Sequence, residues 1–169
     1  MTGKAHVAIG TALTATLAYK TNLAPALLGG EVYLAIAVLA ATPGSYLPDI
    51  DHQQSHYGRK VQAVSKHMKH RGITHTLLIP ALVAIAYLFL LKPAIPLGVA
   101  SKVVRSITFG LEVGYLAHLV ADMFNGAGIP LLWPISKSKI HIMDLDSSGW
   151  QCMLFTILCV GGCALCFLM

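Results

Sequence analysis

The sequence predicts an all-α fold, a polytopic integral membrane bundle of about four to five transmembrane helices. Two observations carry this prediction. The 169 residues are 56% hydrophobic and only 11% charged, whereas about 25% of the residues of an average soluble domain are charged. Apolar stretches of helix length also recur along the chain, and a protein with one anchor would need only one. We treat residues 1–169 as a single membrane-embedded domain, with motifs in 2–134 and a last span at 151–169.

Five segments meet or approach the length of about 20 apolar residues that a helix needs to cross a bilayer. In chain order they cover residues 5–19, 31–47, 73–91, 106–123 and 151–169. The first is short and rich in threonine, so it is the weakest of the five. The apolar stretch 93–100 contains two prolines and a glycine and is predicted as a connector.

The distribution of basic residues predicts the orientation of the chain in the membrane and argues against a nucleic-acid partner. The net charge is +5, from 12 basic and 7 acidic residues. The basic residues lie between apolar segments, where topology and anionic headgroups explain them, and no nucleic-acid partner is expected. With five spans, eight basic residues share the face of the amino terminus and four lie on the other. The positive-inside rule therefore places the amino terminus in the cytoplasm.

Three polar clusters each lie at one end of an apolar segment. They are Leu-Pro-Asp-Ile-Asp-His at 47–52, Lys-His-Arg-Gly-Ile-Thr-His at 69–75, and the pair His118 and Asp122. Ionisable groups at membrane depth are costly and usually functional. Alternating spans bring all three clusters and the amino-terminal His6 to one face, so the sequence predicts a shared site near the cytoplasmic surface. Its candidate ligands are His6, Asp49, Asp51, His52, His70, His75, His118 and Asp122.

The residue types indicate a metal site. His118 and Asp122 are four apart on a helix and project from one face. Asp49 and Asp51, in an extended segment, would point one way and His52 the other. Imidazole and carboxylate without thiolate suit zinc first, with manganese or iron as alternatives. Structural readings stay open, because the two aspartates can cap a helix and His118 can simply pair with Asp122.

Two further charged residues have more than one reading. Arg71 lies four residues before His75, and its guanidinium suits bidentate binding of a phosphate. The same side chain could instead extend to the membrane surface. Glu112 lies inside an apolar segment, two turns before His118. It can support the site, carry protons or pack against another helix.

These motifs, together with Gly-Ile-Pro-Leu-Leu-Trp-Pro at 128–134, resemble the YdjM family of bacterial inner-membrane proteins, described as metal-dependent hydrolases. The resemblance covers about residues 2–134 and implies distant similarity to zinc-dependent phospholipase C and the single-strand zinc nucleases, which use clustered metals. It implies more than one ion, a multi-pass inner-membrane location, and His6, Asp49, His75, His118 and Asp122 as ligands. Asp51, His52 and His70 are then ligands or their supports. Where relatives often have Thr-Pro, this chain has Asn125-Gly126.

The function predicted is a membrane-bound hydrolase that cleaves a phosphoester of a membrane lipid or lipid phosphate. Asp49 or Asp51 would act as base or orient the attacking water. Arg71 and the metal would stabilise charge on the phosphoryl oxygens. Two alternatives remain, a divalent metal ion transporter or channel and a non-catalytic membrane adaptor with a structural metal. Transport requires ligands along a route through the membrane, and a structural metal requires a closed coordination shell.

Overall fold

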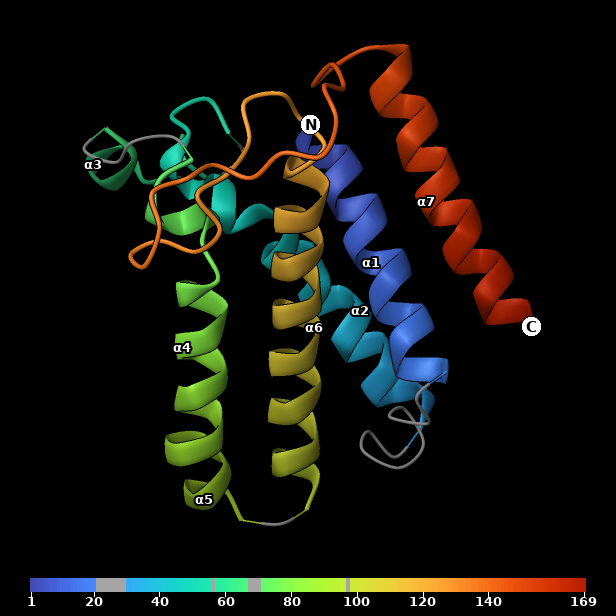
Figure 1. Cartoon of the computed structure of the whole chain (residues 1–169). Coiled ribbons are helices and arrows are strands. Elements are labelled where there is room, and N and C mark those ends of the chain that lie inside the picture. Colours follow the sequence, from blue (N-terminus) through green and yellow to red (C-terminus); the bar gives the residue numbers. More distant parts are fainter. Residues whose placement is uncertain (21–29, 56, 67–70, 97) are drawn as a thin grey trace.

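The computed structural model describes residues 1–20, 30–55, 57–66, 71–96 and 98–169 (Figure 1). Regular structure in these residues is helical, and extended pairing is limited to two isolated bridges within 125–145. This confirms the all-α prediction. The long helices are α1 (Gly3–Lys20), α2 (Glu31–Tyr46), α6 (Val99–Asp122) and α7 (Trp150–Leu168).

The third predicted segment, 73–91, forms one apolar rod, Leu78–Ala94. It consists of α4 (Leu78–Ala86), a π-helical turn (Tyr87–Leu91) and α5 (Lys92–Ala94). The rod begins five residues later than predicted, because Ile73–His75 folds as a separate 3-10 turn, η3. A short α-helix, α3 (Gln62–Ser65), lies within the long polar connector.

Helix α6 begins at Val99, seven residues before the predicted start of its segment. The prediction stopped at the cationic residues Lys102 and Arg105, which lower the local hydropathy. A helical backbone continues through such residues, since long cationic side chains can reach the surface while their stems cover apolar area. Of the helices in the described part, α6 and α7 are long and apolar enough to cross a membrane. The count of four to five spans therefore stays a prediction.

Helices α2 and α6 pack backbone to backbone through small residues. A Cβ added to Gly110 would lie 2.0 Å from the carbonyl oxygen of Ala37, and one added to Gly114 would lie 2.4 Å from that of Ala41. No side chain fits at either position. Small residues spaced by four are the usual means of close helix approach in membranes. The seam fixes the end of α2 against the last three turns of α6.

The threonines of α1 are satisfied within their own helix. Thr11, Thr14 and Thr16 each donate a hydrogen bond to the carbonyl four residues earlier, at 2.7–3.0 Å. A helix that satisfies its hydroxyls internally can lie in an apolar environment. The threonine content that made this segment the weakest prediction is thus compatible with a membrane helix.

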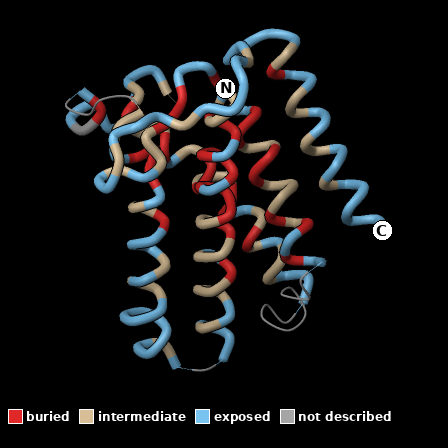
Figure 2. The backbone as a smooth tube through the Cα atoms, in the orientation of Figure 1, coloured by how far each residue is buried: buried red, intermediate tan, exposed pale blue. Residues whose placement is uncertain are grey.

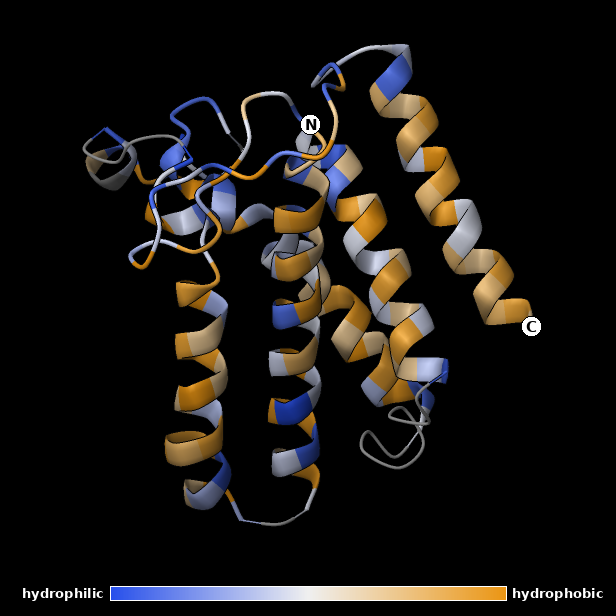
Figure 3. Ribbon diagram, viewed as in Figure 1, coloured by the Kyte–Doolittle hydropathy of each residue, from blue (hydrophilic) through white to orange (hydrophobic). Residues whose placement is uncertain are grey.

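The outer helices differ sharply from the central ones. Figure 2 shows buried residues concentrated where α1, α2 and α6 meet, whereas α4 and α7 are mostly exposed. Helix α7 lies against α1, and Cys152 is its one buried residue. The exposed surfaces of α4 and α7 are apolar (Figure 3). Polar side chains gather instead at the end of the bundle that carries the amino terminus, across which the segment 123–149 runs.

Candidate metal centre

The aspartates after α2 do not lie in an extended segment, so that prediction is wrong. Pro48–Asp51 forms one 3-10 turn, η2, with Pro48 at its first position. Residues two apart in such a turn lie about 120° apart around its axis. Asp49 and Asp51 therefore diverge. The carboxylate of Asp49 is 17% exposed and faces the histidines, whereas Asp51 is 2% exposed and faces η3.

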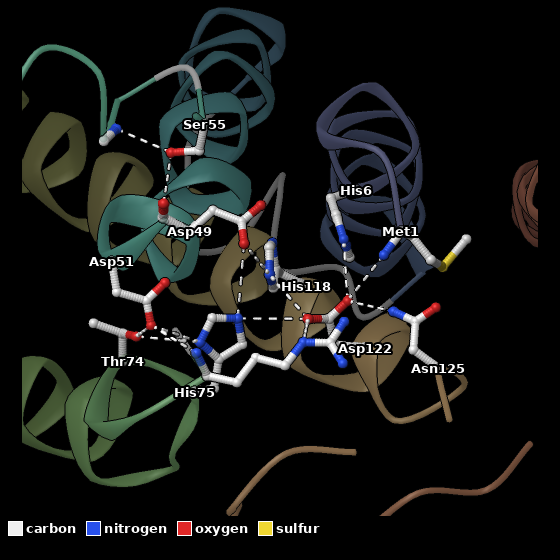
Figure 4. Close-up of polar contacts among 12 residues, drawn as sticks. Met1, His6, Asp49, Asp51, Ser55, Thr74, His75, His118, Asp122 and Asn125 are labelled. Carbon is white, nitrogen blue, oxygen red and sulfur yellow. Dashed lines mark hydrogen bonds and ion pairs between the residues drawn. The ribbon is translucent and has the colours of Figure 1, made fainter. Parts of the chain in front are cut away.

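The last turns of α6 form the floor of the site. His118 and Asp122 share one helix face, with 3.7 Å between His118 Nε2 and Asp122 Oδ2. The His6 ring, from the first turns of α1, stacks on His118 at 3.8 Å between ring centroids (Figure 4). His6 Nε2 lies 3.3 Å from Asp122 Oδ1. All three side chains are buried.

His75 completes the cluster from η3. Its Nε2 lies 3.4 Å from Asp122 Oδ2 and 3.8 Å from Asp49 Oδ1. Two groups of three ligand atoms result, each with all atoms within 4.8 Å of one another, and His118 belongs to both. The groups are His6, His118 and Asp122, and Asp49, His75 and His118. The structure thus brings together all five residues that the resemblance implied as ligands.

The hydrogen bonding of His118 shows that the cluster fits a cation. Its Nδ1 lies 2.7 Å from the Ser45 carbonyl oxygen, which can only accept, so Nδ1 carries the proton and donates it. Nε2 then carries an unshared electron pair. That atom is buried without a hydrogen-bond partner, and its nearest charged neighbours are the carboxylates of Asp49 and Asp122, each at 3.7 Å. Acceptors that converge on one buried space are satisfied by a metal ion.

Asp51 supports His75 from behind and belongs to neither group of three. Thr74 Oγ1 donates to Asp51 Oδ2 at 2.6 Å and lies 3.1 Å from His75 Nδ1. The Tyr115 hydroxyl donates to the Thr74 carbonyl and so holds η3 against α6. Burial lowers the pKa of His75, but the carboxylates of Asp122 and Asp51 outweigh it and raise that pKa to about 9.

Arg71 is held at the edge of the cluster by an unusual backbone. Its φ of 58° lies in the left-handed region that non-glycine residues rarely adopt. The Arg71 N–H donates to Asp51 Oδ2 at 2.9 Å, and its Nε lies 3.5 Å from Asp122 Oδ2. A strained backbone that is fixed by a buried carboxylate is typical of functional sites.

An opening of about 270 Å³ gives access to the cluster. Its wall is made by Met1, Thr2, Asp49, His52, Arg71, Asp122 and Ser147. His52 therefore lines the approach and is in neither group of ligand atoms. His70 lies outside the described residues. Carboxylates of both groups are reached from this side, so the site can admit a ligand.

Four contributors were not anticipated from the sequence. Asn125 Nδ2 donates to Asp122 Oδ1 at 2.8 Å, the Ser45 carbonyl orients His118, and Thr74 links Asp51 to His75. The amino group of Met1 also lies 3.3 Å from Asp122 Oδ1. A backbone carbonyl carries no sequence signal. Asn125, however, lies three residues after the helical aspartate, where the resemblance implied a departure from the family pattern, and that was the available signal.

Comparison with known proteins identifies the family. The YdjM inner membrane protein family matches residues 1–167 of the chain. This chain belongs to the YdjM inner membrane protein family. The inner membrane protein YdjM of Escherichia coli (strain K12) and that of Shigella flexneri are each 36% identical over 138 residues, which are 79% of this chain and 66% of those proteins. The chain thus spans just under two thirds of their length.

Another similar protein is the uncharacterized protein YvsG of Bacillus subtilis (strain 168). It is 32% identical over 138 residues, which are 79% of this chain and 74% of that protein. No solved structure matches the chain. Family membership and the two apolar helices α6 and α7 assign the protein to the inner membrane.

Proposed function

We propose that this YdjM-family protein is a membrane-bound metal-dependent hydrolase that cleaves a phosphoester of a lipid or lipid-linked substrate. One observation carries the proposal. The Nε2 lone pair of His118 is buried between carboxylates and has no hydrogen-bond donor. The ligand types suit zinc first, and manganese or iron after it. Two groups of ligand atoms that share His118 support more than one ion.

The metal would supply one piece of chemistry. A divalent ion lowers the pKa of a coordinated water to near neutrality and so provides a nucleophile. The chain's own residues do the rest. Asp49 is partly exposed at the opening, so it can accept the proton of the attacking water. Asp51 instead fixes the ring of His75 and positions it as a ligand.

Arg71 is the residue suited to the phosphoryl group. Its side chain is 12% exposed and lines the opening beside Asp122. A guanidinium binds two oxygens of a phosphate and stabilises charge that develops on them. The distant similarity to zinc-dependent phospholipase C that the sequence motifs imply would favour a phosphoester as the substrate. The basic residues around the site support a position near the cytoplasmic face of a multi-pass protein.

The position of the acidic side chains, which lie mostly at helix ends, favours a hydrolase over an ion transporter. In the described helices, Glu112 is the one acidic side chain away from a helix end, and its Oε1 is buried without a hydrogen-bond partner. A transport route would need further ligands beyond it. An opening of about 270 Å³ onto the carboxylates also argues against a closed structural metal. Zinc and manganese flux into proteoliposomes discriminates transport from hydrolysis.

The first test is elemental analysis of the full chain in detergent, beside His118→Ala and Asp122→Ala. We expect near-stoichiometric zinc or manganese in the wild type and its loss from both variants. His52→Ala is the matched control, because that histidine lines the opening but belongs to neither ligand group. Release of phosphate or headgroup from phosphatidic acid, phosphatidylglycerol and undecaprenyl phosphate then identifies the substrate. A folded wild type that takes up no metal from excess zinc or manganese would refute the proposal.

A further inference from the structure

A second space lies between the start of α1 and the first turns of α7. It is a groove of about 320 Å³, within the range of about 300–1,000 Å³ that is usual for ligand pockets. Its wall is mostly apolar, and is formed by Thr2, Lys4, Ala5, Gly149, Cys152, Met153, Thr156 and Ile157. None of the α7 residues in this wall takes part in the metal centre.

The groove adjoins the opening of the metal centre, because Thr2 lines both spaces. Ser147 also lines the opening, and Gly149, two residues later in the chain, lines the groove. The carbonyl of Thr2 accepts the N–H groups of Ala5 and His6, so this shared border is tied to the helical turn that carries a metal ligand. A molecule bound at the opening can extend into the groove along these two borders.

The groove is also open on its outer side. Met153 and Ile157 are 61% and 58% exposed, and α7, a candidate membrane-spanning helix, is exposed over most of its apolar surface. Lys4 stands exposed at the end of the groove that lies nearest the polar end of the bundle. A cation at headgroup depth attracts an anionic lipid. Apolar wall, lateral opening and a cation at the border together match a lipid with a negatively charged headgroup.

We infer that this groove holds a hydrocarbon chain of an anionic phospholipid whose phosphoester lies at the metal opening. The inference rests on the proposed function and adds the position of the lipid tail. The tail enters sideways from the bilayer between α1 and α7. The phosphate then lies between Lys4 and Arg71, on the side from which Asp49 and Asp122 are reached. Long-chain lipids, rather than water-soluble phosphoesters, are the substrates that the groove selects.

The test compares two neighbouring residues of α7. Ile157→Trp fills the groove, whereas Leu158→Trp places the same ring on an exposed position, 64% accessible, outside the groove wall. The metal-loaded full chain is assayed in nanodiscs with dioleoyl phosphatidylglycerol and with the water-soluble ester bis(p-nitrophenyl) phosphate. We expect Ile157→Trp to lower kcat/KM for the long-chain lipid at least about tenfold, a typical effect of a misplaced substrate, with the soluble ester unaffected. Leu158→Trp should leave both unchanged.

Equal losses in the two variants on the long-chain lipid would overturn the inference. A second measurement does not depend on turnover, so it separates this inference from the proposed function. Native mass spectrometry counts phospholipids that stay bound in detergent. We expect one per chain in the wild type and in Leu158→Trp, and at least about fivefold less in Ile157→Trp, as loss of a filled pocket requires. A wild type that carries no bound phospholipid would show that the groove does not hold a lipid tail. A wild-type dimer that dissociates only in Ile157→Trp would show instead that a second copy of the chain covers the groove.

Discussion

The two helices that are long and apolar enough to cross a membrane perform different tasks. Helix α6 is central, carries the acidic residues Glu112 and Asp122, and packs by its glycines against α2. Helix α7 carries no charged residue, is mostly apolar and has one buried residue, Cys152. The less apolar helix is thus the more buried one. In a membrane protein, burial follows from close packing and paired polar groups, because lipid already satisfies an apolar surface.

The largest effect is expected when a candidate metal ligand of α6 is replaced, and no effect is expected from the cysteines of α7. His118→Ala removes the ligand that both groups share. Metal affinity should fall by more than about 100-fold, because even residues that only support a ligand are worth about 10–100-fold. Replacing Cys159, Cys163 and Cys166 of α7 by alanine should leave metal content unchanged, since these free thiols share an apolar, partly exposed face. Loss of zinc from the three-cysteine variant, with zinc retained in His118→Ala, would contradict this prediction.

The next effect is on the free energy of unfolding, and it comes from the different packing of α6 and α7. Gly110→Ala on α6 would place a Cβ 2.0 Å from the Ala37 carbonyl oxygen. We expect a loss of about 3 kcal/mol in unfolding free energy, at the upper end for overpacking. Gly161→Ala on α7 is the matched control, because nothing lies within 4 Å of the added atom. Its stability should stay the same or rise by up to about 1 kcal/mol from helix propensity.

Thermal unfolding in one detergent measures both glycine variants. A lower Tm for Gly110→Ala alone would confirm that α6 is held by its backbone seam. Equal Tm values would mean that α2 and α6 can move apart at no cost, contrary to the fold described above.

The comparison also separates what the sequence could predict from what it could not. Long apolar runs predicted the helices, because a run of that length has few other stable forms in a membrane. The start of α6 was misplaced, since Lys102 and Arg105 interrupt the run without interrupting the helix. The seam was not predicted, because a glycine is read as close packing only when its neighbour in space is known.

The candidate site shows the same division. Polar clusters at the ends of apolar segments pointed to His6, His75, His118 and Asp122, which the structure gathers in one place. The separate tasks of Asp49 and Asp51 could not be predicted. They follow from the 3-10 turn Pro48–Asp51, in which residues two apart point in different directions. Asp49 therefore faces the shared ligand space, and Asp51 contacts His75 from behind.

A smaller effect is expected where a carboxylate supports a ligand without joining the ligand groups. Asp51→Asn keeps an acceptor for Thr74 and Arg71 but removes the charge behind His75. Metal affinity should fall about 10–100-fold, as for other supporting residues. Asp49→Asn, the matched variant two residues earlier, should abolish turnover because Asp49 lines the opening. Competition for zinc against a chelator, with turnover alongside, measures both. Equal behaviour of the two variants would contradict their separate tasks.

The smallest effect is the pH dependence of metal binding at the polar end of the bundle. The carboxylates of Asp122 and Asp51 outweigh burial and raise the pKa of His75 to about 9. Near neutral pH the metal-free ring is therefore protonated, and a metal must displace that proton. Affinity should rise about tenfold per pH unit until about pH 9 and then level off. In the metal-free protein the charged ring stabilises the fold below its unfolded pKa, and this contribution is lost as the pH rises through about 9.

Chelator competition across this pH range, in wild type and Asp51→Asn, tests the assignment. Without the Asp51 charge the pKa of His75 falls, so the affinity of the variant should level off at a lower pH than that of the wild type. Metal binding that is equally steep in both proteins would locate the displaced proton on another ligand. Because no cysteine of α7 belongs to either ligand group, the three-cysteine variant should follow the wild-type curve. A shifted curve in that variant would mean that α7 also contributes to the metal centre.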